Sequence, residues 1–406
     1  MRSKIKSESN SSSMWKQMGN IVSQYDGLIA GYTDYPATEQ ALGKFAFQIL
    51  NGAGDYITLQ GVLNPNTLPD WSKMSDSEIL TKLGRMGHCS ALIKVRPGYE
   101  DIFAGHSSWC VRVGSGVQTD AATPSNTQQH VTGCANGRNI GLIMLQTTNS
   151  LFNTSLLKYV STESLLAWHR VRLSNLMARG GKEWAEIYTQ YNSGTYNNQY
   201  MLLDLKKVQL KKSLLTGALW VVEQIPGLVV SGDQTEILRA GYWPSYNVPF
   251  YEQVIYNLSG FPEFVKEHGL MFSYQLAPRA EIFRRDQGKV VDVESMKHIL
   301  RYNAMFLKNF HEFVACFTVP LLVSFYVADY PNDTYSDNNP YNSICSRGDL
   351  LIPSDRSPDG CYDTKVLRTP NARRRERRIC CTHAFGVARV VCREAYMNLS
   401  SANKTT

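Results

Sequence analysis

The apolar positions near residue 90 follow the pattern of two short strands joined by a tight turn. Residues 91–95 read ALIKV and residues 102–104 read IFA, with a Pro-Gly pair between them. Short apolar runs that flank such a pair are typical of a β-hairpin. Cys89 precedes the first run and His106 follows the second, and these ends lie side by side in an antiparallel pair. We therefore expect the Cys89 thiol and the His106 imidazole to come within reach of each other.

Apolar residues at intervals of three and four predict helices elsewhere in the chain. The segments with this spacing are 15–32, 38–56, 162–181, 182–191 and 294–301. The third and fourth should form a pair, with Ser161 or Thr162 as the N-cap of the first helix and Gly180-Gly181 at its end. Apolar, β-branched runs predict buried strands over 199–205, 217–224 and 228–233.

Three segments depart from these patterns. Residues 1–13 are polar and rich in serine, which predicts disorder. Residues 110–141 are poor in apolar side chains and rich in Thr, Ser, Gly and Asn, which predicts a loop. The apolar stretch 313–328 contains Pro320 and is shorter than the ~20 residues that a bilayer span requires. A buried helix or strand is the better interpretation of that stretch.

Composition and charge narrow the classes of function. The chain has 406 residues, of which 43% are hydrophobic, so one to three domains with a large core are expected. The net charge is +7, and part of it comes from the basic run 373–378. Such a run can be a nuclear signal or a nucleic-acid patch, but it is more often a solvated tail. Because aromatic residues do not alternate with it, we expect no nucleic-acid partner.

The cysteines and the N-terminus suggest a compartment but no metal site. Nine cysteines are too scattered for a small disulfide scaffold, and Cys380-Cys381 with His383 and Cys392 lacks metal-ligand spacing. The N-terminal residues have no apolar core of a secretion signal. Glycosylation sequons nevertheless occur at Asn10, Asn153, Asn257, Asn332, Asn398 and Asn403. We therefore expect the start of the precursor to lie outside this sequence.

Cys89 is the principal candidate for chemistry. A thiolate beside a base is a strong nucleophile, so the predicted hairpin permits covalent catalysis. The competing interpretation is that a cysteine at a strand end is a small buried hydrophobe.

Seven motifs, in order, resemble the phospholipase B-like family, which includes the lamina ancestor proteins. The first is HCSALIKV with the PG turn and AGHSSW, within residues 88–109. The others are LQTTNS (145–150), YNSGTYNNQY (191–200), EQIPGLVV (223–230), GYWPSYNVP (241–249), APRAEIFRRDQ (277–287) and GCYDTKV (360–366). The resemblance covers most of 87–300 and a piece near 342–366.

The resemblance implies an N-terminal-nucleophile hydrolase. The expected fold is α+β, a four-layer αββα sandwich of two antiparallel sheets. The precursor would cleave itself between His88 and Cys89. The expected divisions are a disordered 1–13, an α-chain or propeptide remnant 14–88, a catalytic β-chain 89–366 and a divergent basic tail 367–406. Departures from the family at the start, at 110–141, at an insertion 304–329 and after 366 suggest an incomplete sandwich, from a faulty gene prediction or a degenerate copy.

The resemblance also assigns roles to individual residues. Cys89 would be the nucleophile, and its freed α-amine the general base. His106 would polarise the thiol or position substrate, Asn247 would donate to an oxyanion, and Arg279 would steady the thiolate or orient the substrate carbonyl. The competing interpretations are that His106 is a hydrogen-bonded structural histidine, that Asn247 is a turn asparagine, and that Arg279 forms a structural ion pair.

Further residues are implied with less defined roles. Trp109, Asn198 and Trp243 are candidates for substrate binding, together with Tyr196 as a possible part of an acyl pocket, although aromatic residues are more often core. Cys345 and Cys361 resemble a disulfide-bonded pair of the family, which requires an oxidising compartment. No metal or organic cofactor is required.

The implied reaction is hydrolysis of acyl esters of glycerophospholipids through a Cys89 thioester, in a lysosomal or secreted protein. The partner would be a lipid or acyl-amide substrate, with a membrane surface only as the source of substrate. The sequence leaves the oligomeric state open. It also leaves two alternatives: an amidase acting on N-acyl lipids or peptides, and an inactive remnant that at most binds lipid.

Overall fold

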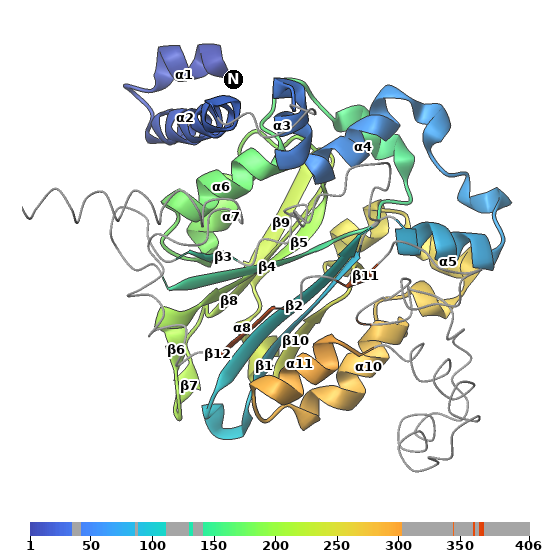
Figure 1. Ribbon diagram of the computed structural model, residues 1–406. Coiled ribbons are helices and arrows are strands. Elements are labelled where there is room, and N and C mark those ends of the chain that lie inside the picture. Colours follow the sequence, from blue (N-terminus) through green and yellow to red (C-terminus); the bar gives the residue numbers. More distant parts are fainter. Residues whose placement is uncertain are drawn as a thin grey trace, which may run out of the picture.

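The computed structural model describes residues 1–34, 42–85, 88–110, 130–132, 141–302, 344, 360–361 and 365–368. Within them, two five-stranded antiparallel sheets lie between helices (Figure 1). The expectation of an α+β fold with two antiparallel sheets is confirmed.

The first sheet is built on the hairpin that the sequence predicts. Its strands are β1 (His88–Val95), β2 (Ile102–Cys110), β10 (Tyr242–Ser245), β11 (Gly360–Cys361) and β12 (Lys365–Arg368). The order is β10-β1-β2-β11, and β12 also pairs with β2. Gly98 forms the turn at φ +65°, a conformation that glycine adopts without steric cost.

The second sheet has the strand order β3-β4-β5-β8-β9. Its strands are β3 (His130–Thr132), β4 (Leu142–Thr148), β5 (Asn198–Asp204), β8 (Leu219–Ile225) and β9 (Leu228–Asp233). The last three confirm the strands predicted from apolar runs. A separate two-stranded ribbon joins β6 (Val208–Gln209) to β7 (Ser213–Leu214).

The helices of the described chain fall before, between and after these strands. They are α1 (Arg2–Glu8), α2 (Ser13–Asp34), α3 (Lys44–Asn51), α4 (Ala53–Leu63), α5 (Asp76–Arg85), α6 (Ala167–Met177), α7 (Gly181–Thr189), α8 (Thr235–Arg239), α9 (Phe261–His268), α10 (Pro278–Asp286) and α11 (Val293–Leu300). The paired helices α6 and α7 and the helix α11 confirm the predictions from helical spacing. None of the described helices combines the length and the apolar character that crossing a membrane takes.

Three apolar clusters stack these elements into four layers. One cluster joins α2, α6 and α7 to one face of the second sheet, through Met144 and Leu202. A second cluster fills the space between the sheets, where Ile93 meets Leu145. The third joins the outer face of the first sheet to α10 and α11, through Leu92. Alternate residues of β1 thus face opposite layers, as strand geometry requires. Figure 1 shows the resulting helix–sheet–sheet–helix order.

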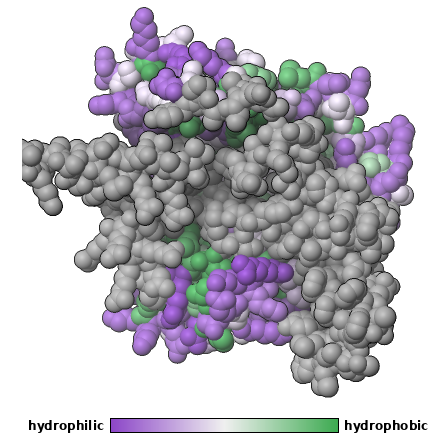
Figure 2. Space-filling model, viewed as in Figure 1, coloured by the Kyte–Doolittle hydropathy of each residue, from purple (hydrophilic) through white to green (hydrophobic). Residues whose placement is uncertain are grey.

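The N-terminal helix corrects the prediction of disorder over residues 1–13. α1 forms because Ile5 packs against the helical cluster, and because Arg2 pairs with Asp26 of α2 at 2.6 Å. Composition alone does not reveal such tertiary support. Figure 2 shows mostly hydrophilic residues over this helix pair, while Trp15 and Met18 of α2 are buried beneath it.

Three other boundaries differ from the sequence-based expectation. β3 lies within 110–141, where we predicted a loop, because it finds a partner edge on β4. α6 begins at Ala167, and neither Ser161 nor Thr162 caps it. β12 extends past Val366, so sheet pairing continues for two residues into the segment that we separated as the tail. The rest of that tail and the segment 304–329 lie outside the described residues.

A buried carboxylate from α4 supplies the missing cap of α6. Asp55, which is 1% exposed, accepts hydrogen bonds from the backbone N–H of Ala167 at 2.8 Å and of Trp168 at 3.3 Å. The first N–H groups of a helix need such acceptors, and a negative charge there is favourable. Asp55 therefore ties the segment before Cys89 to the segment after it.

Candidate active site

Cys89 lies at the start of β1 and is 5% exposed. Cys89 stands opposite Ser108, and Ala91 stands opposite His106, so Cys89 and His106 are diagonal neighbours on one face of the hairpin. That face is the one directed at the second sheet, because Ala91 and Ile93 belong to the cluster between the sheets. The structure thus brings the two predicted residues onto a common face.

His106 is held by the second sheet. Its Nε2 lies 2.8 Å from the backbone oxygen of Gln146 on β4. A carbonyl oxygen only accepts, so Nε2 carries a proton and donates it, which leaves Nδ1 as the acceptor of the neutral ring. The ring is 1% exposed. His106 therefore bridges the two sheets beside Cys89.

Asn247 contacts the backbone nitrogen of Cys89. Its Oδ1 accepts from the Cys89 N–H at 3.2 Å, and its Nδ2 donates to the Thr148 oxygen at 2.5 Å. Asn247 has φ +72°, an uncommon conformation for a residue other than glycine and one that often occurs at functional sites. Thr148 uses one of the two N–H groups of Nδ2. Asn247 therefore holds Cys89 through Oδ1, and its role as an oxyanion donor stays a prediction.

Arg279 lies in the first turn of α10 and is 1% exposed. Its Nη1 donates to the Cys89 oxygen at 2.9 Å, to Asn247 Oδ1 at 2.7 Å and, more weakly, to Ser90 Oγ at 3.4 Å. A buried guanidinium needs such acceptors to offset the cost of desolvation. Asn247 thus binds the backbone nitrogen of Cys89, and Arg279 binds its backbone oxygen.

Glu223 supports the loop that presents Asn247, and our sequence analysis did not select it. Its carboxylate on β8 is fully buried and accepts from the backbone N–H of Phe250 at 2.8 Å and of Tyr251 at 3.0 Å. The side chains of Gln199 and Asn149 donate to it at 2.7 and 3.2 Å. Burial raises the pKa of Glu223, and these hydrogen bonds only partly oppose that effect. The available signal was an acidic residue inside the apolar run LWVVEQI.

The raised pKa of Glu223 predicts a specific pH dependence of stability. A group whose pKa is higher in the folded state stabilises the fold fully below its unfolded pKa, near 4.5, and loses that contribution as pH rises through the folded pKa. The free energy of unfolding of the wild type, measured in urea from pH 4 to 7, should therefore fall relative to that of Glu223→Gln. Parallel curves for the two proteins would contradict the assignment.

The residues predicted to bind substrate occupy other environments. Trp243 is 1% exposed in the core between the sheets, and its Nε1 donates to Gln199 Oε1 at 3.3 Å. Asn198 is buried and its Nδ2 donates to the Tyr196 oxygen and the Tyr200 hydroxyl, both at 2.9 Å. These contacts favour packing roles for both. Trp109 lies on β2 opposite His88 and Cys361, and its side chain is outside the described part.

The predicted disulfide and cleavage site are only partly described. Cys345 lies outside the described residues, while Cys361 lies on β11. Their pairing stays a prediction, as does cleavage between His88 and Cys89. Among the described residues, no three His, Cys, Asp or Glu side chains are grouped as a metal site would require.

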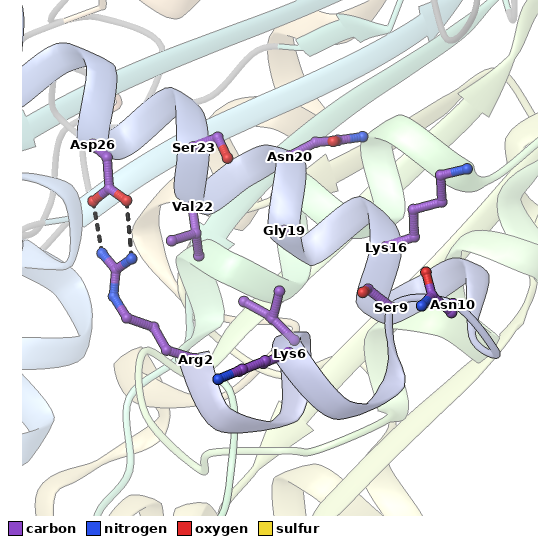
Figure 3. Close-up of a pocket in the computed structure, with 11 residues that line it drawn as sticks. Arg2, Lys6, Ser9, Asn10, Lys16, Gly19, Asn20, Val22, Ser23 and Asp26 are labelled. Carbon is purple, nitrogen blue, oxygen red and sulfur yellow. Dashed lines mark hydrogen bonds and ion pairs between the residues drawn. The ribbon is translucent and has the colours of Figure 1, made fainter.

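A separate groove lies between α1 and α2 (Figure 3). It has a volume of about 510 Å³ and is lined largely by polar side chains, among them Lys6, Asn10, Lys16 and Asn20. None of the predicted site residues lines this groove. The candidate chemistry therefore remains with the cluster of Cys89, His106, Asn247 and Arg279.

Comparison with known families agrees with the motifs. A family model described as phospholipase B matches residues 1–112 and 137–318. The unmatched gap falls inside 110–141, the segment that we found divergent. The match also includes residues 304–318, which corrects our interpretation of the whole of 304–329 as an insertion.

Curated relatives carry the same name. "Phospholipase-B 81" of Drysdalia coronoides is 45% identical over 376 residues, which cover 87% of this chain and 62% of the relative. "Phospholipase B-like 1" of Rattus norvegicus is 46% identical over 370 residues, covering 87% and 61%. "Phospholipase B-like protein A" of Dictyostelium discoideum is 32% identical over 388 residues, covering 87% and 63%.

The chain thus spans about 62% of the length of the first of these relatives. The family model matches it on both sides of Cys89 and over more than half of its residues. The chain belongs to the phospholipase B family.

Proposed function

We propose that this chain hydrolyses acyl esters of glycerophospholipids, with Cys89 as a nucleophile that becomes N-terminal when the His88–Cys89 bond is cleaved. The observation that supports the proposal is the pair of hydrogen bonds to the backbone of Cys89. Asn247 Oδ1 accepts from its nitrogen at 3.2 Å, and Arg279 Nη1 donates to its oxygen at 2.9 Å. Both contacts fix the backbone on which an N-terminal nucleophile depends.

Cleavage would begin with attack of the Cys89 sulfur on the carbonyl carbon of His88. An S–C bond forms and the C–N bond breaks, so the nitrogen of Cys89 takes up the thiol proton and becomes an amine. Water then hydrolyses the thioester, releasing the carboxylate of His88 and the thiol of Cys89. Asn247 Oδ1 would hold the nitrogen in place throughout, since it accepts an N–H from either an amide or an amine.

The freed amine would then serve as the general base. An α-amine has a pKa near 7.7–8.0, close enough to that of a thiol to accept its proton near neutrality. The positive charge of Arg279 lies against the same residue and would favour the thiolate. Apart from water, this route uses only groups of the protein.

Ester cleavage would follow in two transfers. The sulfur attacks the acyl carbonyl, the glyceryl oxygen leaves with the proton held by the amine, and the acyl group remains on Cys89 as a thioester. Water, deprotonated by the same amine, then releases the fatty acid and restores the thiol. The names of the relatives support a phospholipid as the substrate.

A lysosomal or secreted location is part of the proposal. It rests on the six sequons and on the resemblance of Cys345 and Cys361 to a disulfide-bonded pair of the family. Asn257 is one of these sequon residues and is exposed on the surface, where a glycan could be attached. An oxidising compartment would also permit the disulfide.

The substrate class is tested by incubating the full chain, expressed in a secretory host, with phosphatidylcholine in mixed micelles and, separately, with an N-acylethanolamine. We expect fatty acid to be released from the phospholipid at a rate well above that from the amide. Release from the amide alone would make the protein an amidase. Release from neither substrate would indicate an inactive remnant, and either result would overturn the proposal.

A further inference from the structure

The segment from Trp243 to Tyr251 folds back on itself, with Asn247 between its two ends. The ring centroids of Trp243 and Phe250 lie 4.7 Å apart, so the two ends meet. Asn247 has φ +72°, a backbone conformation that is uncommon for a residue other than glycine. The position of Asn247 therefore depends on the groups that hold the ends of this segment.

The end at Phe250 and Tyr251 is attached to strand β8. Glu223 Oε1 accepts a hydrogen bond from the Phe250 N–H at 2.8 Å, and Glu223 Oε2 accepts one from the Tyr251 N–H at 3.0 Å. The Tyr251 hydroxyl donates to the backbone oxygen of Val221, on the same strand, at 3.0 Å. Two residues of β8 thus fix both the backbone and a side chain of this end.

The end at Trp243 reaches the same carboxylate through one side chain. Trp243 Nε1 donates to Gln199 Oε1 at 3.3 Å, and Gln199 Nε2 donates to Glu223 Oε1 at 2.7 Å. Trp243 also stands opposite Ile93 of β1, the strand that carries Cys89. Glu223 is therefore the group at which hydrogen bonds from both ends of the segment meet.

The donors around Glu223 match a carboxylate and not an amide. Besides the two backbone N–H groups, the side chains of Gln199 and Asn149 donate to Oε1, the latter at 3.2 Å. An ionised carboxylate accepts at both oxygens, whereas the amide of glutamine has one acceptor oxygen and a donor group. With glutamine at position 223, at least one N–H group would face another N–H group. Because Glu223 is 0% exposed, bulk water cannot serve as the missing acceptor.

We propose that Glu223 is a positioning residue for the reaction at Cys89, because its carboxylate sets the place of Asn247. Asn247 Oδ1 accepts from the Cys89 nitrogen at 3.2 Å, and in the proposed mechanism that nitrogen becomes the amine that takes the thiol proton. A displaced Asn247 would leave the amine misdirected, and a misplacement of about 1 Å at a reacting group can reduce the rate about 10²-fold. The inference rests on the proposed function.

The test compares phospholipid hydrolysis by Glu223→Gln and by the wild type, with kcat referred to the amount of cleaved chain. We expect kcat of Glu223→Gln to fall about 10- to 100-fold with little change in KM. Asp204→Asn is the matched control, because Asp204 is also buried and accepts from the Lys206 N–H at 3.0 Å, but lies at the opposite end of β5 from Gln199. Its kcat should stay near that of the wild type. A wild-type kcat for Glu223→Gln, or an equal loss in both variants, would overturn the inference.

Hydrogen exchange reports on the position of Asn247 without relying on activity. In the uncut Cys89→Ala chain, residue 89 keeps the N–H that Asn247 Oδ1 accepts, and the Val95 N–H of the same strand donates to the Gly241 oxygen at 2.8 Å. Adding Glu223→Gln should speed exchange at residue 89 about tenfold or more and leave exchange at Val95 unchanged. Unchanged exchange at residue 89, or equal acceleration at both amides, would contradict the inference.

Two further outcomes keep the inference separate from the proposed function. If the wild type is as inactive as Cys89→Ala, the proposed function has failed, and exchange at residue 89 alone decides whether Glu223 positions Asn247. If Glu223→Gln does not fold, Gln199→Met takes its place, because it removes one of the four donors to Glu223. The kcat of Gln199→Met should fall about three- to tenfold, and a wild-type value would overturn the inference.

Discussion

Replacing Cys89 with alanine should reduce phospholipid hydrolysis to the background rate. The substitution removes the sulfur that forms the thioester, and loss of a catalytic nucleophile costs on the order of 10⁶-fold in kcat in comparable acyl-transfer enzymes. The change deletes one buried sulfur atom at the start of β1, so the fold should persist. Fatty acid release from phosphatidylcholine by equal amounts of the two proteins measures the effect.

Cys89→Ser is the informative companion to this variant. A hydroxyl is a weaker nucleophile than a thiol near neutral pH, so its activity should lie between those of the wild type and Cys89→Ala. The circular dichroism spectra of all three proteins should be the same, and their unfolding midpoints should differ only slightly. A Cys89→Ala protein that retains wild-type hydrolysis would exclude Cys89 as the nucleophile.

Replacing Arg279 with methionine should also have a large effect. The change removes the donor that serves the Cys89 oxygen and Asn247 Oδ1, both of them in the buried cluster. A hydrogen bond to a charged group contributes about 1.5–3 kcal/mol, so a loss of about 3 kcal/mol from the two contacts is expected. If that loss falls on the transition state, kcat/KM decreases by about 10²-fold. Steady-state hydrolysis of the phospholipid gives the value.

Arg284→Met is the matched control, because Arg284 lies on the same helix but is exposed and donates to the Gln275 backbone oxygen. Its kcat/KM should stay near that of the wild type. Arg279→Lys keeps the charge but loses the planar donor group, so it should be intermediate. Equal activity of the Arg279→Met and Arg284→Met proteins would remove Arg279 from the site.

The elements around the site could be predicted because their patterns are local. The hairpin of β1 and β2 has two apolar runs and a Pro-Gly turn, and the register that follows puts Cys89 and His106 on one face. The buried strands β5 and β8 contain the apolar runs YMLL and LWVV, which suit a strand buried between two packed layers. These features are determined by residues that are close together in the sequence, so they can be predicted from it.

The contacts that define the site could not be predicted in the same way. The Cys89–Asn247 contact joins residues 158 positions apart, and its direction depends on the left-handed backbone at Asn247. The cap of α6 comes from Asp55, 112 positions before Ala167. Glu223 acts through backbone N–H groups of a distant loop. Each depends on the tertiary arrangement, which no local pattern specifies.

The most direct measurement is the intact mass of the chain after expression in a secretory host, beside that of Cys89→Ala. We expect two wild-type fragments, of which the second has Cys89 as its first residue, and an uncut Cys89→Ala chain. Fragments that begin at any other residue, or cleavage of both proteins at the same bond, would contradict it. A folded wild-type chain that stays uncut would show that Cys89 is not exposed as an N-terminal nucleophile.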